Sequence, residues 1–460
     1  MEQLLKRDGN SCLVSPLNIG ALNQELLVPR CPDKSITHRA LILASMASGR
    51  SEILNPLDSA DCLATKRALE QLGVAVKESR TPEGATVWII DSQGWSSWRS
   101  PNSSVDLGNS GTSARLLTGV LSGVPGLRVI IKGDHSLEKR PMGRVVEPLR
   151  SMGAIVESSK GAQDGHSLPL TITGQSLLSR SHYVETPSAQ VKSALILAGL
   201  TAAGETTVDL PSGTRDHTER MLLALGANIR RRTFSGREVI SVVGPWVPSP
   251  FLCDVPNDPS SVAFFAALAA IHPGLKVTAH DVLSNTTRTG FFTALTKLGV
   301  NVEWFNVKSG PRCLGEFRGS VTFYRPEQSS LQPIELDAED VKALIDEVPI
   351  LAVVCSVSGG TSKIHGLGEL RVKESDRLAA IKDLLTRSGV ECRVHDETLE
   401  IVGLGNPTAF SFSSEDHRLV MAAIILATRG DKSSNIEGIN WIGTSFPLFL
   451  ESFQNIKLDK

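Results

Sequence analysis

The sequence predicts an α/β (α+β) fold built from about six repeated units that divide into two lobes of three. A pattern recurs along the 460-residue chain: an amphipathic helical stretch, then glycine, then a strand-like run opened by a small or β-branched residue. The interval between copies is about 75 residues, which is longer than the common solenoid repeats and fits a compact unit of a few strands and two helices. A composition of 41% hydrophobic and 21% charged residues is typical of a globular protein.

The repeated glycine has a clear structural reason. Glycine ends a helix in the left-handed conformation at low cost, and a β-branched residue can then open a strand. In FLESFQNIKL, which we interpret as a sixth copy, Asn455 takes the left-handed position. The other copies are ALEQLGVAV, LRSMGAIVE, LLALGANIR, LTKLGVNVE and LLTRSGVECRV, with their glycines at Gly73, Gly153, Gly226, Gly299 and Gly389.

The break between the lobes is predicted at PWVPSP, where three prolines between Pro245 and Pro250 disfavour regular structure. A net charge of -2 argues against a nucleic-acid partner. The seven cysteines form no CxxC pair and the histidines form no HExxH motif, so we expect no metal site. The longest apolar run, from Ala263 to Ile271, is too short to span a membrane, and we expect a cytoplasmic protein.

Several segments place basic residues directly ahead of an apolar helix. The N-terminus of a helix offers free N–H groups and a positive potential, which suit phosphate or carboxylate. Each segment alone is equally well explained by surface charge or helix capping, but the set predicts a site for anionic substrates. The segments are DKSITHRALILASMASG, EKRPMGR, TRDHTERM, LRVKESDRL and DHRLVMA, and their cations are Lys34, Arg39, Arg140, Arg215, Lys373, Arg377 and Arg418.

Neutral and acidic residues accompany these cations. Gly111 in LGNSGTSAR permits close approach of a ligand to the backbone, and Ser188 and Gln190 in SAQVKSALILAG offer hydrogen bonds. In IDEVPILA, either Asp346 or Glu347 could act as a general acid or base, or cap a helix.

The fourth basic segment, LRVKESDRL, brings like charges together. Lys373 and Arg377 are four residues apart, so we expect them to share a helix face, where a common anion would relieve their repulsion. Glu374 lies three residues before Arg377.

In their order along the chain, these motifs resemble the 5-enolpyruvylshikimate-3-phosphate (EPSP) synthase family, closest to its branch with glyphosate-tolerant bacterial enzymes. The resemblance runs from about Val28 to Phe446. It implies a two-lobed inside-out α/β barrel of six βαβαββ-type units, with the active site between the lobes. The implied organisation is an N-terminal strand at 1–27 that packs with the C-terminal lobe, an N-terminal lobe at 28–250 and a C-terminal lobe at 251–460.

The resemblance also implies the activity of 3-phosphoshikimate 1-carboxyvinyltransferase. This transferase of the shikimate pathway moves the carboxyvinyl group of phosphoenolpyruvate to the 5-hydroxyl of shikimate 3-phosphate and releases phosphate, on the route to chorismate and the aromatic amino acids. Addition and elimination pass through a tetrahedral intermediate and need no metal or organic cofactor. The two substrates together carry roughly five to six negative charges, which the seven cations balance. We expect a monomer with no nucleic-acid or membrane partner.

Residue roles follow from the resemblance position by position. The implied catalytic residues are Asp346, as acceptor of the hydroxyl proton, and Glu374 with Lys34, which exchange protons with the methylene carbon. The implied contacts to shikimate 3-phosphate are Lys34, Ser35, Arg39, Ser188, Ala189, Gln190, Arg215, Asp346 and Lys373. The implied contacts to phosphoenolpyruvate are Lys34, Gly111, Arg140, Gln190, Arg377 and Arg418.

The first motif departs from the family pattern. Cys31 and Pro32 precede Asp33 where the family has glycine, and proline lacks an N–H and fixes φ, so we expect a different loop before Lys34. Two other functions stay open. One is the UDP-N-acetylglucosamine carboxyvinyl transferase of the same fold, although no cysteine lies between Cys62 and Cys253, where that family carries a reactive one. The other is a non-catalytic anion-binding homologue.

Overall fold

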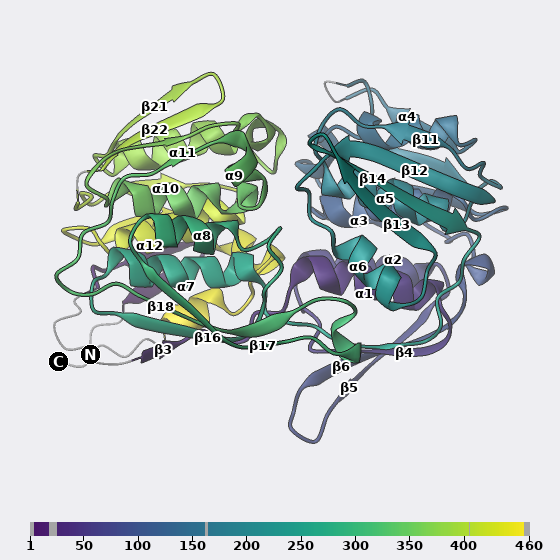
Figure 1. Ribbon diagram of the computed structural model, residues 1–460, viewed down its shortest axis with the longest axis horizontal. Helices are drawn as coiled ribbons and strands as arrows, with labels where there is room; N and C mark the ends of the chain where they lie inside the picture. Colours follow the sequence, from purple (N-terminus) through teal and green to yellow (C-terminus); the bar gives the residue numbers. More distant parts are fainter. Residues whose placement is uncertain (1–3, 18–24, 162–163, 404, 455–460) are drawn as a thin grey trace. The chain divides into compact units, whose positions relative to one another are not determined.

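The computed structural model describes residues 4–17, 25–161, 164–403 and 405–454. The chain forms two compact units, shown in Figure 1. Unit 1 comprises Met1–Cys31, Asn257–Lys308 and Phe317–Lys460, and unit 2 comprises Pro32–Pro256 and Ser309–Glu316. Asn455 of the predicted sixth copy lies outside the described residues.

Unit 2 contains three four-stranded sheets. Their strands are β4 (Ser48–Leu54), β5 (Ala75–Arg80), β6 (Thr86–Gln93), β7 (Val105–Asp106), β8 (Arg128–Lys132), β9 (Ile155–Ser159), β10 (Ser167–Thr173), β11 (Ser181–Tyr183), β12 (Gly204–Pro211), β13 (Ile229–Phe234), β14 (Arg237–Gly244) and β15 (Leu252–Asp254). The sheet orders are β15-β4-β6-β5, β7-β8-β10-β9 and β11-β12-β14-β13.

The helices of unit 2 pack against these sheets. They are α1 (Lys34–Met46), α2 (Ala60–Gln71), α3 (Gly111–Ser122), α4 (Gly143–Ser151), α5 (Ala189–Gly199) and α6 (His217–Ala224). Helices α1, α3 and α5 are buried along most of their length, and α3 packs against both α1 and α5. A helix that is apolar on every side belongs in a core, so these three form the centre of the unit.

Unit 1 repeats the plan with three further four-stranded sheets. Its strands are β1 (Leu5–Asp8), β2 (Ser11–Val14), β3 (Glu25–Leu27), β16 (Lys276–Leu283), β17 (Asn301–Lys308), β18 (Arg318–Tyr324), β19 (Glu335–Leu336), β20 (Gly360–Ile364), β21 (Glu391–His395), β22 (Thr398–Gly403), β23 (Ser411–Ser413) and β24 (Ser434–Glu437). The sheet orders are β17-β18-β16-β3, β19-β20-β22-β21 and β1-β2-β24-β23.

The helices of unit 1 are α7 (Pro259–Ile271), α8 (Gly290–Lys297), α9 (Ala338–Lys342), α10 (Val348–Ser356), α11 (Arg377–Arg387), α12 (His417–Ala427) and α13 (Phe449–Gln454). Every residue of α7 and α10 is buried, and α7, α10 and α12 contact one another. Figure 1 shows these helices side by side within the unit. With helices inside and sheets around them, each unit has the predicted inside-out arrangement.

The six sheets share one pairing scheme. In each sheet, a short edge strand pairs in parallel with the next strand, and the other two pairs of neighbouring strands are antiparallel. In β7-β8-β10-β9, for example, β7 and β8 are parallel, whereas β8 and β9 each run antiparallel to β10. The repeated glycines that join helix to strand all adopt the left-handed conformation, with φ of 95°, 96°, 85°, 94° and 80° at Gly73, Gly153, Gly226, Gly299 and Gly389. The predicted six-fold repeat is therefore confirmed in strand order, and the left-handed glycine is confirmed in its first five copies.

The division into units differs from the predicted lobes at three short segments. Residues 28–31 lie in unit 1, where the Val28 amide donates to the Thr278 carbonyl at 2.8 Å. Residues 251–256 lie in unit 2, because β15 pairs in parallel with β4. Residues 309–316, which join β17 to β18, also lie in unit 2, where Leu314 is part of the hydrophobic core. Proline content alone could not locate these strand pairings.

Candidate active site

In unit 2, the first predicted segment opens α1. Lys34 is the first helical residue, and the carboxylate of Asp33 caps the helix by accepting from the Ile36 amide at 2.7 Å. The unusual residues before it are held by the backbone: Cys31 is buried, and the Asp33 amide donates to the Pro256 carbonyl at 2.7 Å. Lys34 forms an ion pair with Asp61. The altered loop therefore still delivers Lys34 to a helix N-terminus.

Arg39 lies one turn further along α1 and is almost fully buried, with 4% exposure. Its Nε donates to Thr218 Oγ1 at 2.8 Å and its Nη2 to Ser193 Oγ at 2.9 Å. Its Nη1 donates to the carbonyl of Ser35 at 3.0 Å. These three neutral oxygens orient the guanidinium.

A third group of predicted residues meets around Arg115. Its Nη1 donates to Gln190 Oε1 at 2.8 Å and to the Gly111 carbonyl at 3.3 Å, and its Nη2 donates to the Pro141 carbonyl at 3.2 Å. A Cβ atom at position 111 would lie 2.7 Å from Arg115 Nη1 and 3.2 Å from Arg140 Nη1. A side chain at position 111 would therefore displace these guanidinium groups, and Arg115 joins the Gly111, Arg140 and Gln190 segments.

Arg140 is also buried, with 7% exposure, and its Nη2 donates to Asn109 Oδ1 at 2.5 Å. Helix α4 begins only at Gly143, so Arg140 lies in the loop before the helix. Ser188 caps α5 by accepting from the Val191 amide at 3.4 Å, which places Ala189 in the first helical position. Arg215 is half-buried and lies two residues before α6.

In unit 1, the carboxylate of Asp346 lies between two cations. Its Oδ1 is 3.4 Å from Lys373 Nζ and 3.3 Å from Arg377 Nη1. Asp346 belongs to a short 3-10 helix, Ile345–Glu347, that leads into α10. The anion shared by Lys373 and Arg377 is thus supplied by the protein itself. Lys373 precedes α11, so the expectation that the two cations share a helix face is wrong.

Arg377 is a buried cation held by several carboxylates, with 1% exposure. Its Nε lies 2.7 Å from Asp416 Oδ2 and its Nη2 lies 2.5 Å from Glu374 Oε2. Burial alone would lower the pKa of Arg377. The carboxylates of Asp416, Glu374 and Asp346 outweigh burial, so the pKa of Arg377 is raised above its ordinary value. The guanidinium stays charged throughout the physiological pH range.

Arg418 completes the group in unit 1. Its Nη1 donates to the Asp346 carbonyl at 3.0 Å and lies 3.1 Å from Glu347 Oε1. The side chain of Glu347 is 1% exposed, whereas that of Asp346 is 16% exposed. Of the two candidate acids, Glu347 therefore serves as a buried partner of Arg418, and Asp346 is the one that reaches solvent.

Sequence reasoning missed three buried or bridging residues, which are Arg115, Asp416 and His38. Arg115 and Asp416 lie inside the quoted motifs LGNSGTSAR and DHRLVMA, which is the signal that could have found them. His38 is buried beside α2, with its Nδ1 2.8 Å from Thr65 Oγ1. Burial, with help from Lys34 and Arg39, holds the pKa of His38 well below its usual range, so the ring is neutral.

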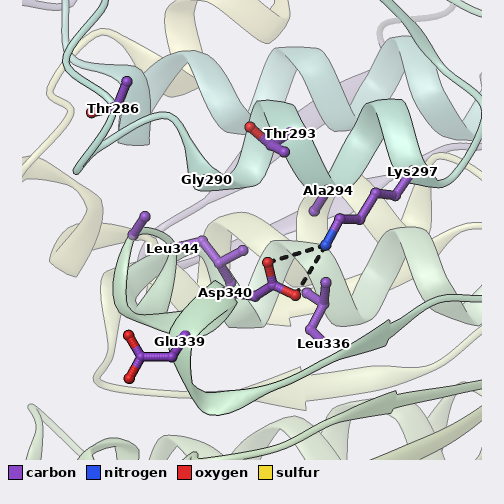
Figure 2. A pocket seen from close by; sticks show the side chains of 10 residues that line it. Thr286, Gly290, Thr293, Ala294, Lys297, Leu336, Glu339, Asp340 and Leu344 are labelled. Carbon is purple, nitrogen blue, oxygen red and sulfur yellow. Dashed lines mark hydrogen bonds and ion pairs between the residues drawn. The ribbon is translucent and has the colours of Figure 1, made fainter. Parts of the chain in front are cut away.

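A pocket of ≈ 320 Å³ lies in unit 1 between α8 and α9 (Figure 2). Lys297 Nζ lies 3.1 and 3.0 Å from the two carboxylate oxygens of Asp340, as the dashed lines of Figure 2 show. These charges satisfy each other, and none of the predicted site residues lines the pocket.

Among the described residues, we find no helix with the length and apolar character that a membrane span requires.

Comparisons with known proteins identify the family. Residues 18–453 match the family model described as EPSP synthase (3-phosphoshikimate 1-carboxyvinyltransferase). The chain belongs to the EPSP synthase family. The 3-phosphoshikimate 1-carboxyvinyltransferase of an Anaeromyxobacter species is 40% identical over 433 residues, covering 94% of this chain and 95% of the relative. That of Oceanobacillus iheyensis is 38% identical over 450 residues, covering 97% and 99%.

Solved structures agree with this membership. An EPSP synthase from Acinetobacter baumannii superposes with a TM-score of 0.79 at 34% identity, covering 96% of this chain and 97% of that one. The enolpyruvyl transferase NikO from Streptomyces tendae, at 16% identity and a TM-score of 0.71, shares the fold. As an EPSP synthase family member, the chain is a transferase of the shikimate pathway that serves aromatic amino acid biosynthesis. The UDP-N-acetylglucosamine and non-catalytic alternatives are not favoured.

Proposed function

We propose that the residues collected in the two units serve one reaction, the transfer of the carboxyvinyl group from phosphoenolpyruvate to the 5-hydroxyl of shikimate 3-phosphate. The observation that carries the residue roles is the pairing of Asp346 with Lys373 and Arg377, at 3.4 and 3.3 Å. A carboxylate between two cations, with its neighbours also predicted to touch substrate, is placed to exchange a proton where anions bind.

The residues of unit 2 bind the anionic parts of the substrates. Arg39, Ser188 and Arg215, with the other unit 2 residues named for shikimate 3-phosphate, supply hydrogen bonds and positive charge. Gly111, Arg140 and Gln190 receive phosphoenolpyruvate, with Arg115 fixing their segments. Arginine is suited to this task because its planar fork of donors matches phosphate and carboxylate.

In unit 1, Lys373 contacts shikimate 3-phosphate, and Arg377 and Arg418 contact phosphoenolpyruvate. Asp346 and Glu374 of unit 1 exchange protons, together with Lys34 of unit 2. The oxygen of the 5-hydroxyl bonds to the enol carbon of phosphoenolpyruvate, and Asp346 accepts the proton that this hydroxyl loses. The methylene carbon gains a proton from Glu374 or Lys34. The carbon–oxygen bond to phosphate then breaks, and the methyl group returns a proton. Glu374 Oε2 lies 2.5 Å from Arg377 Nη2, which places its carboxylate beside the other residues of this group.

Release of phosphate from shikimate 3-phosphate plus phosphoenolpyruvate tests the activity, and Asp346→Asn tests the role. We expect this variant to retain the KM values and to lose about 10²–10⁴-fold in kcat, the usual contribution of general acid–base catalysis. The control is Asp340→Asn, an exposed carboxylate paired with Lys297. Unchanged turnover in Asp346→Asn would discard the role, and absence of phosphate release by the unaltered protein would discard the function.

The proposal extends to a cytoplasmic monomer that works without metal or organic cofactor. All seven cysteines are buried, and their odd number and scattered spacing suit a reducing compartment. Light scattering on the purified protein tests the oligomeric state, and activity after exhaustive treatment with a chelator tests the need for metal. A dimer in solution, or activity restored only by added metal, would contradict these parts.

A further inference from the structure

A lysine with no role in the reaction above lies at the centre of unit 2. Lys192, in the first turn of α5, is 0% exposed. Its Nζ is 2.6 Å from Glu219 Oε1 on α6 and 2.9 Å from Glu238 Oε1 on β14. A buried charge is tolerated only with close partners, and removing one partner alone is strongly destabilising. Lys192 therefore ties two helices and a strand together at one point.

The same network holds the backbone on both sides of Arg215. Glu238 Oε1 also accepts from Thr214 Oγ1 at 2.8 Å, one residue before Arg215. Glu238 Oε2 lies 2.7 Å from Arg231 Nη2, and Arg231 Nη1 lies 3.2 Å from Asp216 Oδ2, one residue after Arg215. Glu238 thus holds Thr214 directly and Asp216 through Arg231, and these are the two residues on either side of Arg215.

The network also sets the two hydroxyls that orient Arg39. Ser193 follows Lys192 on α5, and Thr218 precedes Glu219 on α6. Their hydroxyl oxygens lie 2.7 Å apart, and both accept from Arg39. The ion pair between Lys192 and Glu219 therefore holds the two helices at the separation at which both hydroxyls reach one guanidinium.

We propose that Lys192, Glu219 and Glu238 are positioning residues for shikimate 3-phosphate, acting through Arg39 and Arg215. The inference rests on the proposed function, because it takes Arg39 and Arg215 as contacts to that substrate. None of the three touches the reacting atoms. The arginines around Gln190 are oriented by other groups, so the network governs one substrate and leaves phosphoenolpyruvate binding largely unchanged.

The double variant Lys192→Met/Glu219→Gln tests this. It removes one cation and one carboxylate together, so that Glu238 keeps Arg231 as its partner and the buried charge stays balanced. We expect a Tm close to that of the unaltered protein, a KM for shikimate 3-phosphate raised about tenfold or more, and a KM for phosphoenolpyruvate changed by less than about threefold. The matched control, Lys297→Met/Asp340→Asn, removes a pair from unit 1 and leaves both KM values unchanged.

Two outcomes would overturn the inference. One is an unchanged KM for shikimate 3-phosphate, and the other is a parallel rise in both KM values, which indicates general loosening of the unit. Should the double variant fail to fold, Thr214→Val is measured by the same split between substrates, because it removes the hydrogen bond to Glu238 and alters no buried charge.

Arg215→Ala separates this inference from the roles on which it rests. If Arg215→Ala leaves the KM for shikimate 3-phosphate unchanged, the proposed contact is wrong. If it raises that KM while Lys192→Met/Glu219→Gln does not, only the positioning role fails. When the role holds, Arg215→Ala in the double-variant background raises the KM less than it does alone, because the two changes disturb one interaction.

Discussion

In unit 2, hydroxyl and carbonyl oxygens receive the guanidinium of Arg39, whereas in unit 1 carboxylates surround that of Arg377. Both side chains are buried and both come from the first turns of a helix in a motif quoted from the sequence. Hydrogen bonds to neutral oxygens fix the geometry of the Arg39 guanidinium. Ion pairs hold the buried guanidinium of Arg377 among carboxylates. We expect the two arrangements to differ in how strongly the stability of the surrounding protein depends on the cation.

The largest effect on stability is expected from Arg377→Met. Asp416 lies fully buried against Arg377, and burial alone would raise its pKa, but Arg377 outweighs burial and holds the pKa of Asp416 below its ordinary value. Removing the guanidinium leaves this carboxylate unpaired, and we expect a loss of about 3–5 kcal/mol in the free energy of unfolding, measured in urea. Arg377→Met/Asp416→Asn recovers part of it. Equal stability of Arg377→Met and the unaltered protein would remove the contrast between the units.

Arg39→Met sharpens the same contrast from the other side. The hydroxyls of Ser193 and Thr218 still pair with each other at 2.7 Å, so we expect only about 1 kcal/mol of destabilisation. The lost charge should raise the KM for shikimate 3-phosphate by about 10–100-fold, the worth of a charge-assisted hydrogen bond. Steady-state kinetics and urea unfolding measure the two effects. A stability loss as large as that of Arg377→Met would contradict the contrast between the two arginines.

The acid stability of unit 1 should depend on His272. Burial, with Arg429 and Arg325, lowers the pKa of His272 to about 3, whereas an unfolded histidine titrates near 6.5. Below pH 6.5 the unfolded chain binds a proton that the folded chain does not, so stability present above pH 6.5 is lost as the pH falls towards 3. At pH 5 the loss is about 2 kcal/mol. Urea unfolding of His272→Gln at pH 7.5 and pH 5 should show a flatter dependence, and an unchanged slope would exclude the role.

The smallest effect is expected at the pocket of Figure 2. Lys297 and Asp340 are substantially exposed, with 44% and 37% of their side-chain surfaces accessible. Exposed pairs contribute little, so Lys297→Met should change the free energy of unfolding by less than about 1 kcal/mol and leave both KM values unaltered. A clear rise in either KM would show that the pocket takes part in binding and that the account of unit 1 is incomplete.

Local sequence patterns carried much of the fold because helix ends are local events. Gly73 and Gly389 could be identified since each sits where a periodic apolar stretch meets a strand-like run, and their left-handed φ follows from that position. The candidate cations were found for the same reason, since a helix N-terminus is recognisable in the sequence.

The pairing of these side chains could not be predicted in the same way. Asp416 reaches Arg377 from 39 residues away, and Ser193 reaches Arg39 from 154 residues away. Such contacts depend on how helices pack against one another, which the hydrophobic periodicity of a sequence does not predict. The buried state of Lys192 was missed for this reason, because a lysine beside a helix start has the same local pattern whether it faces solvent or two carboxylates.

The sheet β1-β2-β24-β23 has a consequence for the order of synthesis. Ser11 pairs with Glu437, and the Asn440 amide donates to Asn10 Oδ1 across 430 residues of chain. The hairpin β1–β2 emerges from the ribosome long before β24 exists, so it must wait without its neighbour until most of the chain has been translated. Nearly all of unit 2, by contrast, is available by Pro256. Co-translational folding should therefore complete unit 2 before unit 1.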